Sequence, residues 1–544
     1  MPDDVRLATI HLWPVGRSTV PAVLMRTPYG MMQWPRPLLT LGRLICENGY
    51  HVVLQDVRGR YESEGRFTPH ANEGRDGKAT LDWLAEQSWC DGRIALVGSS
   101  YPGYAAWAAL AEAPERVSAL VVALGARDPY ASFYPGGAFS LATALEWGIG
   151  LGERERVSPG EIDLERALAY RPLREADRVA LRRVDAYRHW LDHPRRDGFW
   201  EALCSTLPEH PPPCLLLAGW YDIFLAAQLS DYLALDDDAR ARGSIAPRLV
   251  IGPWAHGRVA HPSWRGRGTN PLGVALRETL RFLDRQLGDT PDRDGPERGE
   301  EVDTVRFYVL GAARWRNESR WPAPGVHPRS LHFRSGGAAN GLRGDGSLSW
   351  DAPEEQEPAD HYRYEPGDPV PSLAGRVLGR AGGATDQRPV ESRLDVLCYT
   401  SAKLQEKIEI AGPVTVSLYA SSSAEDADFT AKLVDVALDG TALNLCEGIA
   451  RSRWSGRTAA EKEPHWLRPG EATHIEIDLG ATACVFDRGH RIRVEISSSN
   501  FPHFDRNPSN RNDPATTQPE EQDGAEQIVY HDAAHPSQVV LPVL

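Results

Sequence analysis

The feature that most constrains the fold is an alternation of short apolar runs and helix-like stretches in the first part of the chain. Runs rich in Val, Leu and Ile at 20–30, 50–59 and 93–100 each end in turn residues, as buried parallel strands do. Helix-like stretches follow the second and third runs, at 73–89 and 104–113. Strands that alternate with helices predict an α/β sheet.

This alternation is interrupted once and then resumes. Residues 127–212 contain long helix-like stretches and no convincing strand, which predicts a helical cap. Strand-like and helix-like runs alternate again from 213 to 289. We therefore expect one α/β-hydrolase domain in two parts, 1–126 and 213–289, split by the cap.

The last part of the chain has a different pattern. A charged segment with Gly and Pro, 290–302, is typical of a linker. From 303 to 544 helix signals nearly vanish, and short alternating runs separated by turns predict an all-β domain of jelly-roll type. A chain of 544 residues is long enough to form two or three domains, each with its own hydrophobic core.

The net charge and the cysteines argue against several classes of partner and of structural site. The net charge of −15 argues against nucleic acid or an anionic membrane, since both need clustered positive charge. No apolar stretch approaches the ~18 residues of a membrane span, and no secretory signal pattern is present, so we expect a cytoplasmic protein. The seven cysteines are scattered without a Cys-x-x-Cys pair, which implies neither a disulfide framework nor a zinc site. We expect no metal and no cofactor.

The stretch "VGSSYPG" lies at a predicted strand-to-helix corner. Gly98 and Ser100 fit the pattern G-x-S-x-G of a nucleophile elbow, with Ser99 as the variable residue, but position 102 is proline and the glycine follows at 103. A serine that only caps the following helix is the simpler alternative. The motif alone leaves both interpretations open.

Two further residues favour the catalytic interpretation. Asp222 and His256 each follow a predicted strand, in the order Ser, Asp, His that α/β-hydrolases use. A serine hydroxyl needs an imidazole to remove its proton, and the imidazole needs a carboxylate to orient it. Taken singly, Asp222 could cap the next helix and His256 could be a packing residue. All three positions together indicate a Ser100–His256–Asp222 triad.

Six blocks, spread over nearly the whole chain, make the resemblance specific. "RTPYG", "DVRGRYESEGRF", "VGSSYPG", "AGWYD", "GPWAH" and "IEIAGPVTVSLYASSSAEDADFTAKLVDV" resemble the cocaine-esterase-like serine hydrolases, relatives of X-prolyl dipeptidyl peptidases and α-amino-acid ester hydrolases. That family's motif is Gly-x-Ser-Tyr-x-Gly, so the proline at 102 is expected. Ile223 departs from the family, which often has glycine there.

The resemblance also implies roles for other residues. The backbone N–H of Tyr101 and the phenol of Tyr29 would form the oxyanion hole. Phe133, Trp147 and Phe224 match aromatic positions around the substrate, although packing between cap helices would explain each equally well. Asp56 and Arg58 are expected to support nearby loops.

We therefore expect a serine hydrolase that cleaves a small-molecule carboxylic ester, or an amide, through an acyl-enzyme. An X-prolyl aminopeptidase or an acylase-type amide hydrolase is the alternative. A peptidase or amino-ester substrate would need an acidic group, such as Glu146 in the cap, to bind its ammonium. A non-catalytic protein that binds carbohydrate or a partner is the alternative from another class. Sheet edges could also pair in a homodimer.

Overall fold

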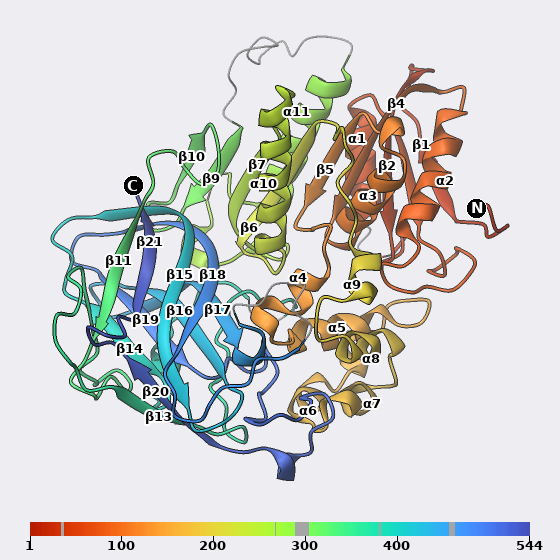
Figure 1. Cartoon of the computed structure of the whole chain (residues 1–544). Helices are drawn as coiled ribbons and strands as arrows, with labels where there is room; N and C mark the ends of the chain where they lie inside the picture. The colour runs from red at the N-terminus through yellow and green to blue at the C-terminus, as the bar shows by residue number, and fades with distance from the viewer. Residues whose placement is uncertain (34–36, 267, 289–303, 380–381, 456–462) are drawn as a thin grey trace.

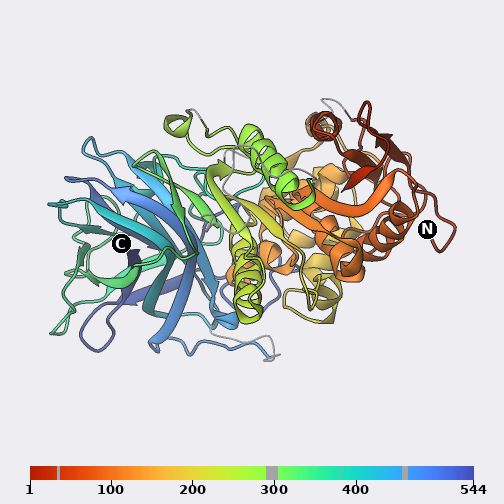
Figure 2. The ribbon, with the colours of Figure 1, turned by 90° about the horizontal axis from the view of Figure 1, so that it is seen from above.

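The computed structural model describes residues 1–33, 37–266, 268–288, 304–379, 382–455 and 463–544. Its strands form two large sheets, and a group of helices lies beside both of them (Figure 1). The expected linker 290–302 lies outside the described residues. The two sheets stand side by side and give the molecule an elongated outline (Figure 2).

The first sheet has ten strands in the described residues, in the order β1-β3-β2-β4-β5-β6-β7-β9-β10, with β8 paired to β7. The neighbours from β3 to β9 are parallel, and β1, β8 and β10 are antiparallel additions. The strands are β1 (Thr9–Leu12), β2 (Val20–Thr27), β3 (His51–Asp56), β4 (Cys90–Ser99), β5 (Ala119–Ala123), β6 (Cys214–Tyr221), β7 (Arg248–Ala255), β8 (Arg258–Val259), β9 (Val305–Val309) and β10 (Arg314–Glu318).

Helices cover both faces of this sheet, which explains why its inner strands β2, β3 and β6 are buried along their whole length. In β6, Leu215 and Leu217 pack toward α1 and α11, whereas Leu216 packs toward α2, α3 and α10. The bounds are α1 (Pro37–Glu47), α2 (Glu73–Ala85), α3 (Tyr101–Glu112), α10 (Leu225–Arg242) and α11 (Pro271–Leu287). No helix in the described ranges is both long and apolar enough to cross a bilayer.

Six α-helices lie between β5 and β6, in the segment that the sequence predicts as a cap. They are α4 (Tyr130–Phe133), α5 (Leu141–Leu151), α6 (Leu164–Ala169), α7 (Ala176–Ala180), α8 (Asp185–Asp192) and α9 (Gly198–Leu203). They share a core of their own that includes Phe139, Leu145 and Trp190, and Val377 of the C-terminal domain joins it. The cap therefore packs against both other parts of the molecule (Figure 1).

The second sheet has eleven strands in the described residues, in the order β13-β20-β15-β21-β11-β12-β14-β19-β16-β17, with β18 paired to β15. Its neighbours are antiparallel, apart from β12 and β14. A short helix, α12 (Arg388–Glu391), lies between β13 and β14. The strands are β11 (His327–Arg334), β12 (Ser347–Ser349), β13 (Asp360–Tyr364), β14 (Leu397–Ser401), β15 (Ile408–Ser422), β16 (Asp428–Val436), β17 (Ala442–Arg451), β18 (Thr473–Phe486), β19 (Arg491–Ser497), β20 (Ala525–Tyr530) and β21 (Gln538–Val543).

Two strands that follow residue 303, the expected start of the β-sandwich, join the first sheet. β9 pairs in parallel with β7, from Leu249 opposite Val305 to Ile251 opposite Phe307, and β10 pairs with β9. Both strands therefore extend the first sheet. The alternating pattern of 305–309 marks a strand, but a strand five residues long does not reveal which sheet it will join. One continuous hydrophobic core runs from the first sheet into the second.

Candidate active site

The corner between β4 and α3 holds Ser100 in an unusual backbone conformation. Its φ is 63° and its ψ is −132°, a region that costs a non-glycine residue on the order of 1–3 kcal/mol. Such strain persists only where the surroundings enforce it, and it is frequent at functional sites. The turn places Ser100 directly before the first residue of α3.

Three glycines make this turn sterically feasible. A Cβ at Gly98 would lie 2.1 Å from the carbonyl oxygen of Pro102, and one at Gly103 would lie 2.9 Å from Val122 Cγ1. A Cβ at Gly125 would lie 2.7 Å from the carbonyl oxygen of Ser100. The motif predicts the first two glycines. The third lies after β5 and carries no motif, so sequence reasoning missed it.

The structure brings Ser100, His256 and Asp222 into one hydrogen-bonded chain. His256 Nε2 lies 3.0 Å from Ser100 Oγ, and His256 Nδ1 lies 2.7 Å from Asp222 Oδ2. Asp222 follows β6, is fully buried, and accepts a second hydrogen bond from the backbone N–H of Phe224 at 2.9 Å. Ser99, by contrast, does not line the pocket around Ser100.

The carboxylate of Asp222 decides in which direction the pKa of His256 is shifted. Burial lowers the pKa of His256, but the charge of Asp222 and its hydrogen bond outweigh burial and raise this pKa above its ordinary value of 6.5. The bond to Nδ1 also leaves Nε2 facing the serine as an acceptor when the ring is neutral. The arrangement is suited to proton transfer from Ser100 Oγ.

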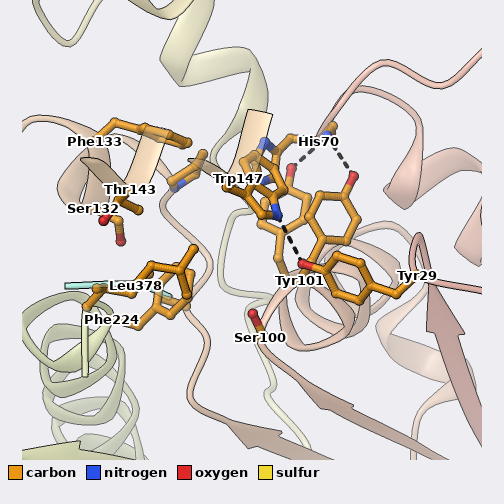
Figure 3. A pocket seen from close by; sticks show the side chains of 14 residues that line it. Tyr29, His70, Ser100, Tyr101, Ser132, Phe133, Thr143, Trp147, Phe224 and Leu378 are labelled. Carbon is orange, nitrogen blue, oxygen red and sulfur yellow. Dashed lines mark hydrogen bonds between the residues drawn. The ribbon is translucent and has the colours of Figure 1, made fainter. Parts of the chain in front are cut away.

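Tyr29 reaches the nucleophile with its side chain. Its hydroxyl accepts a hydrogen bond from Trp147 Nε1 at 3.0 Å, so the phenol proton stays available for donation toward Ser100 (Figure 3). Burial raises the pKa of Tyr29, and hydrogen bonds with Trp147 and Ser100 offset only part of that rise. The phenol is therefore protonated at neutral pH and can act as a donor.

Tyr101 presents a different atom to the site. Its backbone N–H lies in the first turn of α3, where no acceptor within the helix exists. Its phenol points elsewhere: it donates to Glu73 Oε1 at 2.8 Å and accepts from the backbone N–H of His70 at 2.8 Å. The side chain of Tyr101 thus anchors the helix, and its backbone N–H lies in the residue directly after Ser100.

The loop after β3 supports these groups. Asp56 Oδ1 accepts from the backbone N–H of Met31 at 2.8 Å, and Arg58 pairs with Asp76 at 2.7 Å. Sequence reasoning missed Arg60, which is fully buried and donates to the carbonyl oxygens of Pro28 and Leu151. Arg60 therefore joins the turn before Tyr29 to the end of α5, the helix that carries Trp147. Its signal in the sequence is a second arginine in the block "DVRGR".

A pocket opens above Ser100, and all three aromatic residues from the sequence analysis line it. Phe133 and Trp147 come from the cap, and Phe224 precedes α10 (Figure 3). Leu378 of the C-terminal domain also lines the pocket, a contribution with no sequence signal. We call this space, about 540 Å³ and partly open to solvent, the acyl pocket.

The described lining of the acyl pocket contains no Asp, Glu, Lys or Arg side chain. His70 also lines the pocket, and its imidazole is neutral because burial lowers the pKa of that side chain to about 3. Glu146, the expected partner for an ammonium, is not part of this lining, and its carboxylate lies against Gly379. Among the described residues, no group of three or more His, Cys, Asp or Glu side chains is placed to hold a metal ion.

Comparison with known proteins places the chain in a family. Residues 3–258 match the model described as X-Pro dipeptidyl-peptidase (S15 family), and residues 299–540 match that of the X-Pro dipeptidyl-peptidase C-terminal non-catalytic domain. The cocaine esterase of Rhodococcus sp. (strain MB1 Bresler) is 37% identical, with 100% of this chain and 97% of the esterase covered.

Two solved structures share the whole architecture. An aminopeptidase from the marine sediment archaeon Thaumarchaeota archaeon is 26% identical with a TM-score of 0.85, and an α-amino acid ester hydrolase is 25% identical with a TM-score of 0.85. Each alignment covers 100% of this chain and 95% of the other. The predicted fold class, an α/β-hydrolase domain with a C-terminal β domain, is thereby confirmed. The chain therefore belongs to the cocaine-esterase-like serine hydrolases and is a serine ester hydrolase.

Proposed function

We propose that this hydrolase cleaves carboxylic esters with an apolar acyl group through an acyl-enzyme on Ser100. The hydrogen-bonded chain from Ser100 Oγ through His256 to Asp222 is the observation that carries the proposal. The strained turn that holds Ser100 supports it, since that turn exposes the hydroxyl at the start of α3.

In the first half-reaction, His256 Nε2 takes the proton of Ser100 Oγ while that oxygen attacks the ester carbonyl carbon. The carbonyl electron pair moves onto oxygen, where the Tyr29 phenol and the Tyr101 N–H donate hydrogen bonds. As the tetrahedral intermediate collapses, the bond to the alcohol oxygen breaks, and His256 protonates that oxygen. Asp222 stabilises the imidazolium throughout.

In the second half-reaction, water takes the place of the alcohol. His256 removes a proton from the water, whose oxygen attacks the acyl carbon, and Ser100 Oγ leaves with the proton that His256 returns. The products are the carboxylic acid and the free serine. The chain's own residues supply every proton transfer.

The lining of the acyl pocket favours an apolar acyl group. Aromatic and aliphatic side chains surround the space. Binding an apolar acyl group there removes apolar surface of both partners from water, which is favourable in free energy. An aminoacyl substrate would bury an ammonium that no carboxylate of the described lining can pair. The aminopeptidase alternative is therefore disfavoured.

Three substrates test the proposal. We expect turnover of p-nitrophenyl acetate and p-nitrophenyl butyrate, and none of Gly-Pro-p-nitroanilide. Ser100→Ala should abolish ester turnover, and a fluorophosphonate probe should label the wild type but not this variant. Turnover that survives Ser100→Ala would refute the assignment of the nucleophile, and a wild type that cleaves neither ester would favour the binding-protein alternative.

A further inference from the structure

Three residues stand between the acyl pocket and a second cavity beside it. Ser132 of α4, Thr143 of α5 and Ile223, which lies between β6 and α10, line both spaces. Ser132 and Thr143 stand side by side across the acyl pocket from Ser100 (Figure 3). The three residues therefore separate the two spaces, and we call them the partition.

The second cavity differs in chemistry from the acyl pocket. It contains about 1300 Å³ of empty space, part of it open to solvent, and neither Ser100 nor His256 lines it within the described part of the chain. We call this space the polar cavity. Its lining includes five charged or titratable side chains of the C-terminal domain: Arg376, Glu447, Glu476, Asp478 and His503.

The polar cavity keeps its charge, which makes it a poor site for an alkyl chain. Burial would raise the pKa of Glu447, but His503, Lys432 and Arg376 outweigh burial and lower this pKa to about 2. Glu447 is therefore ionised at neutral pH. An alkyl chain in this space would displace water from charged groups without replacing its hydrogen bonds.

Ile223 has the largest side chain of the partition, and the backbone around it is held in place. Asp222, the residue before it, accepts a hydrogen bond from the backbone N–H of Phe224, the residue after it, at 2.9 Å. Ile223 is half-buried, and it is not among the residues that form or pack against the hydrophobic cores of the described ranges. Its side chain therefore bounds the two cavities rather than filling a core.

Resting on the proposed function, we infer that Ile223 limits the length of the acyl group, and that this hydrolase therefore selects esters of short-chain acids. An acyl chain that starts at Ser100 and extends across the acyl pocket reaches the partition. Each methylene group up to that point moves from water into apolar surroundings, whereas the next one must displace Ile223 or enter the polar cavity. Ile223 is thus a specificity-determining residue on the acyl side of the site.

The first experiment measures kcat/KM for p-nitrophenyl esters whose acyl chains lengthen by one carbon at a time, from acetate to decanoate. In the wild type, kcat/KM should rise by up to about fourfold for each methylene group that the acyl pocket buries. The rise should stop at one chain length, which we call the length limit. Because all these esters share one leaving group, the length limit reports on the acyl side alone.

Two substitutions at Ile223 should move the length limit by different amounts. Ile223→Val deletes one methyl group and should extend the limit by about one carbon, and Ile223→Ala should extend it by about three carbons. For the acyl chain at that extended limit, Ile223→Ala should raise kcat/KM relative to acetate by about 10–50-fold over the wild type. This ratio compares two substrates of one enzyme, so the fraction of folded protein cancels.

Two controls isolate the partition. Ile162→Ala makes the same change at a half-buried isoleucine that packs against the cap core and lines neither cavity, so the length limit should stay where it is. Methyl, butyl and hexyl acetate vary the alcohol instead of the acid. Ile223→Ala should leave the ratios of kcat/KM among these three esters unchanged.

The outcomes separate the inference from the proposed function. If the wild type cleaves none of these esters, or Ser100→Ala cleaves them equally well, the proposed function itself fails. If cleavage depends on Ser100 but kcat/KM keeps rising to decanoate, or Ile223→Ala leaves the length limit in place, only the inference about Ile223 fails. It also fails if Ile162→Ala moves the limit as far, because a loosened cap then explains both variants, or if the alcohol series responds instead.

Discussion

At the scale of single residues, the two tyrosines beside Ser100 differ in which of their groups is free to face the serine. Tyr29 offers its phenol, which Trp147 orients, whereas the phenol of Tyr101 is bound to Glu73. The oxyanion hole proposed above therefore combines one side-chain donor with one backbone donor. Equivalent substitutions at the two positions should have different effects.

Tyr29→Phe should lower kcat/KM for p-nitrophenyl butyrate by about 10²–10³-fold, the usual effect of removing one oxyanion donor. Tyr101→Phe should stay within about tenfold of the wild type, since its N–H remains. The latter variant should instead lose about 1–3 kcal/mol of unfolding free energy in chemical denaturation, because Glu73 loses a buried donor. A folded Tyr101→Phe protein as inactive as Tyr29→Phe would contradict this division.

The pH profile of the ester hydrolysis depends on Asp222. Its charge raises the pKa of His256 above 6.5, so kcat/KM of the wild type should fall as pH drops through a value above 6.5. In Asp222→Asn only burial remains, and the acid limb should move below 6.5 while kcat falls by about 10⁴-fold. Initial rates between pH 5 and 9 measure both effects. An acid limb at the same pH in both proteins would exclude His256 as the titrating base.

At the scale of elements, the second sheet buries a group of charges that the proposed reaction does not use. Lys432 of β16 lies 3.6 Å from Glu495 of β19, and Arg493 of β19 bonds Glu391 of α12 at 2.6 Å. Burial raises the pKa of Glu495, Lys432 opposes the rise, and the neighbouring Glu391 adds to it. Glu495 is therefore protonated well above its ordinary pKa of 4.5.

This group gives the stability a specific pH dependence. The folded protein holds a proton on Glu495 that the unfolded chain releases near pH 4.5, so the contribution is complete below that pH and is lost as pH rises through the raised value. Glu495→Gln should flatten the decline of unfolding free energy between pH 5 and 8, by up to about 1.4 kcal/mol per pH unit. Denaturant titrations at several pH values measure it. Parallel curves for both proteins would show that Glu495 does not keep its proton.

At the scale of the whole molecule, the two sheets share a core, and the site depends on both. Leu378 of the C-terminal domain lines the acyl pocket. Tyr221, the residue before Asp222, donates a hydrogen bond from its hydroxyl to the carbonyl oxygen of Asn444 in β17 at 2.8 Å. The C-terminal domain is thus a structural part of the candidate site. Pairing of sheet edges in a homodimer stays a prediction, which sedimentation velocity can check.

Tyr221→Phe tests the link between the domains. The change leaves the buried carbonyl of Asn444 without its donor, which should cost about 1–3 kcal/mol of unfolding free energy. Tyr170→Phe, at a half-exposed position in the cap, is the control and should change stability by less than about 0.5 kcal/mol. Equal effects of the two substitutions would show that the hydroxyl of Tyr221 contributes nothing across the interface.

The sequence by itself determined the features that depend on local pattern. The periods of its apolar residues predicted the α/β sheet, the helices between β5 and β6, and the β domain, because backbone geometry ties each period to one element type. Small residues at 98 and 103 marked the elbow, since only glycine fits against Pro102 and Val122 there. Asp222 and His256 were recognisable because each directly follows a strand.

Only the tertiary structure decided what depends on contacts between distant segments. The sheet to which β9 belongs, the need for glycine at 125, the bond from Trp147 to Tyr29 and the place of Leu378 in the pocket all join residues far apart in the chain. Side-chain packing selects such contacts from many that one sequence pattern permits.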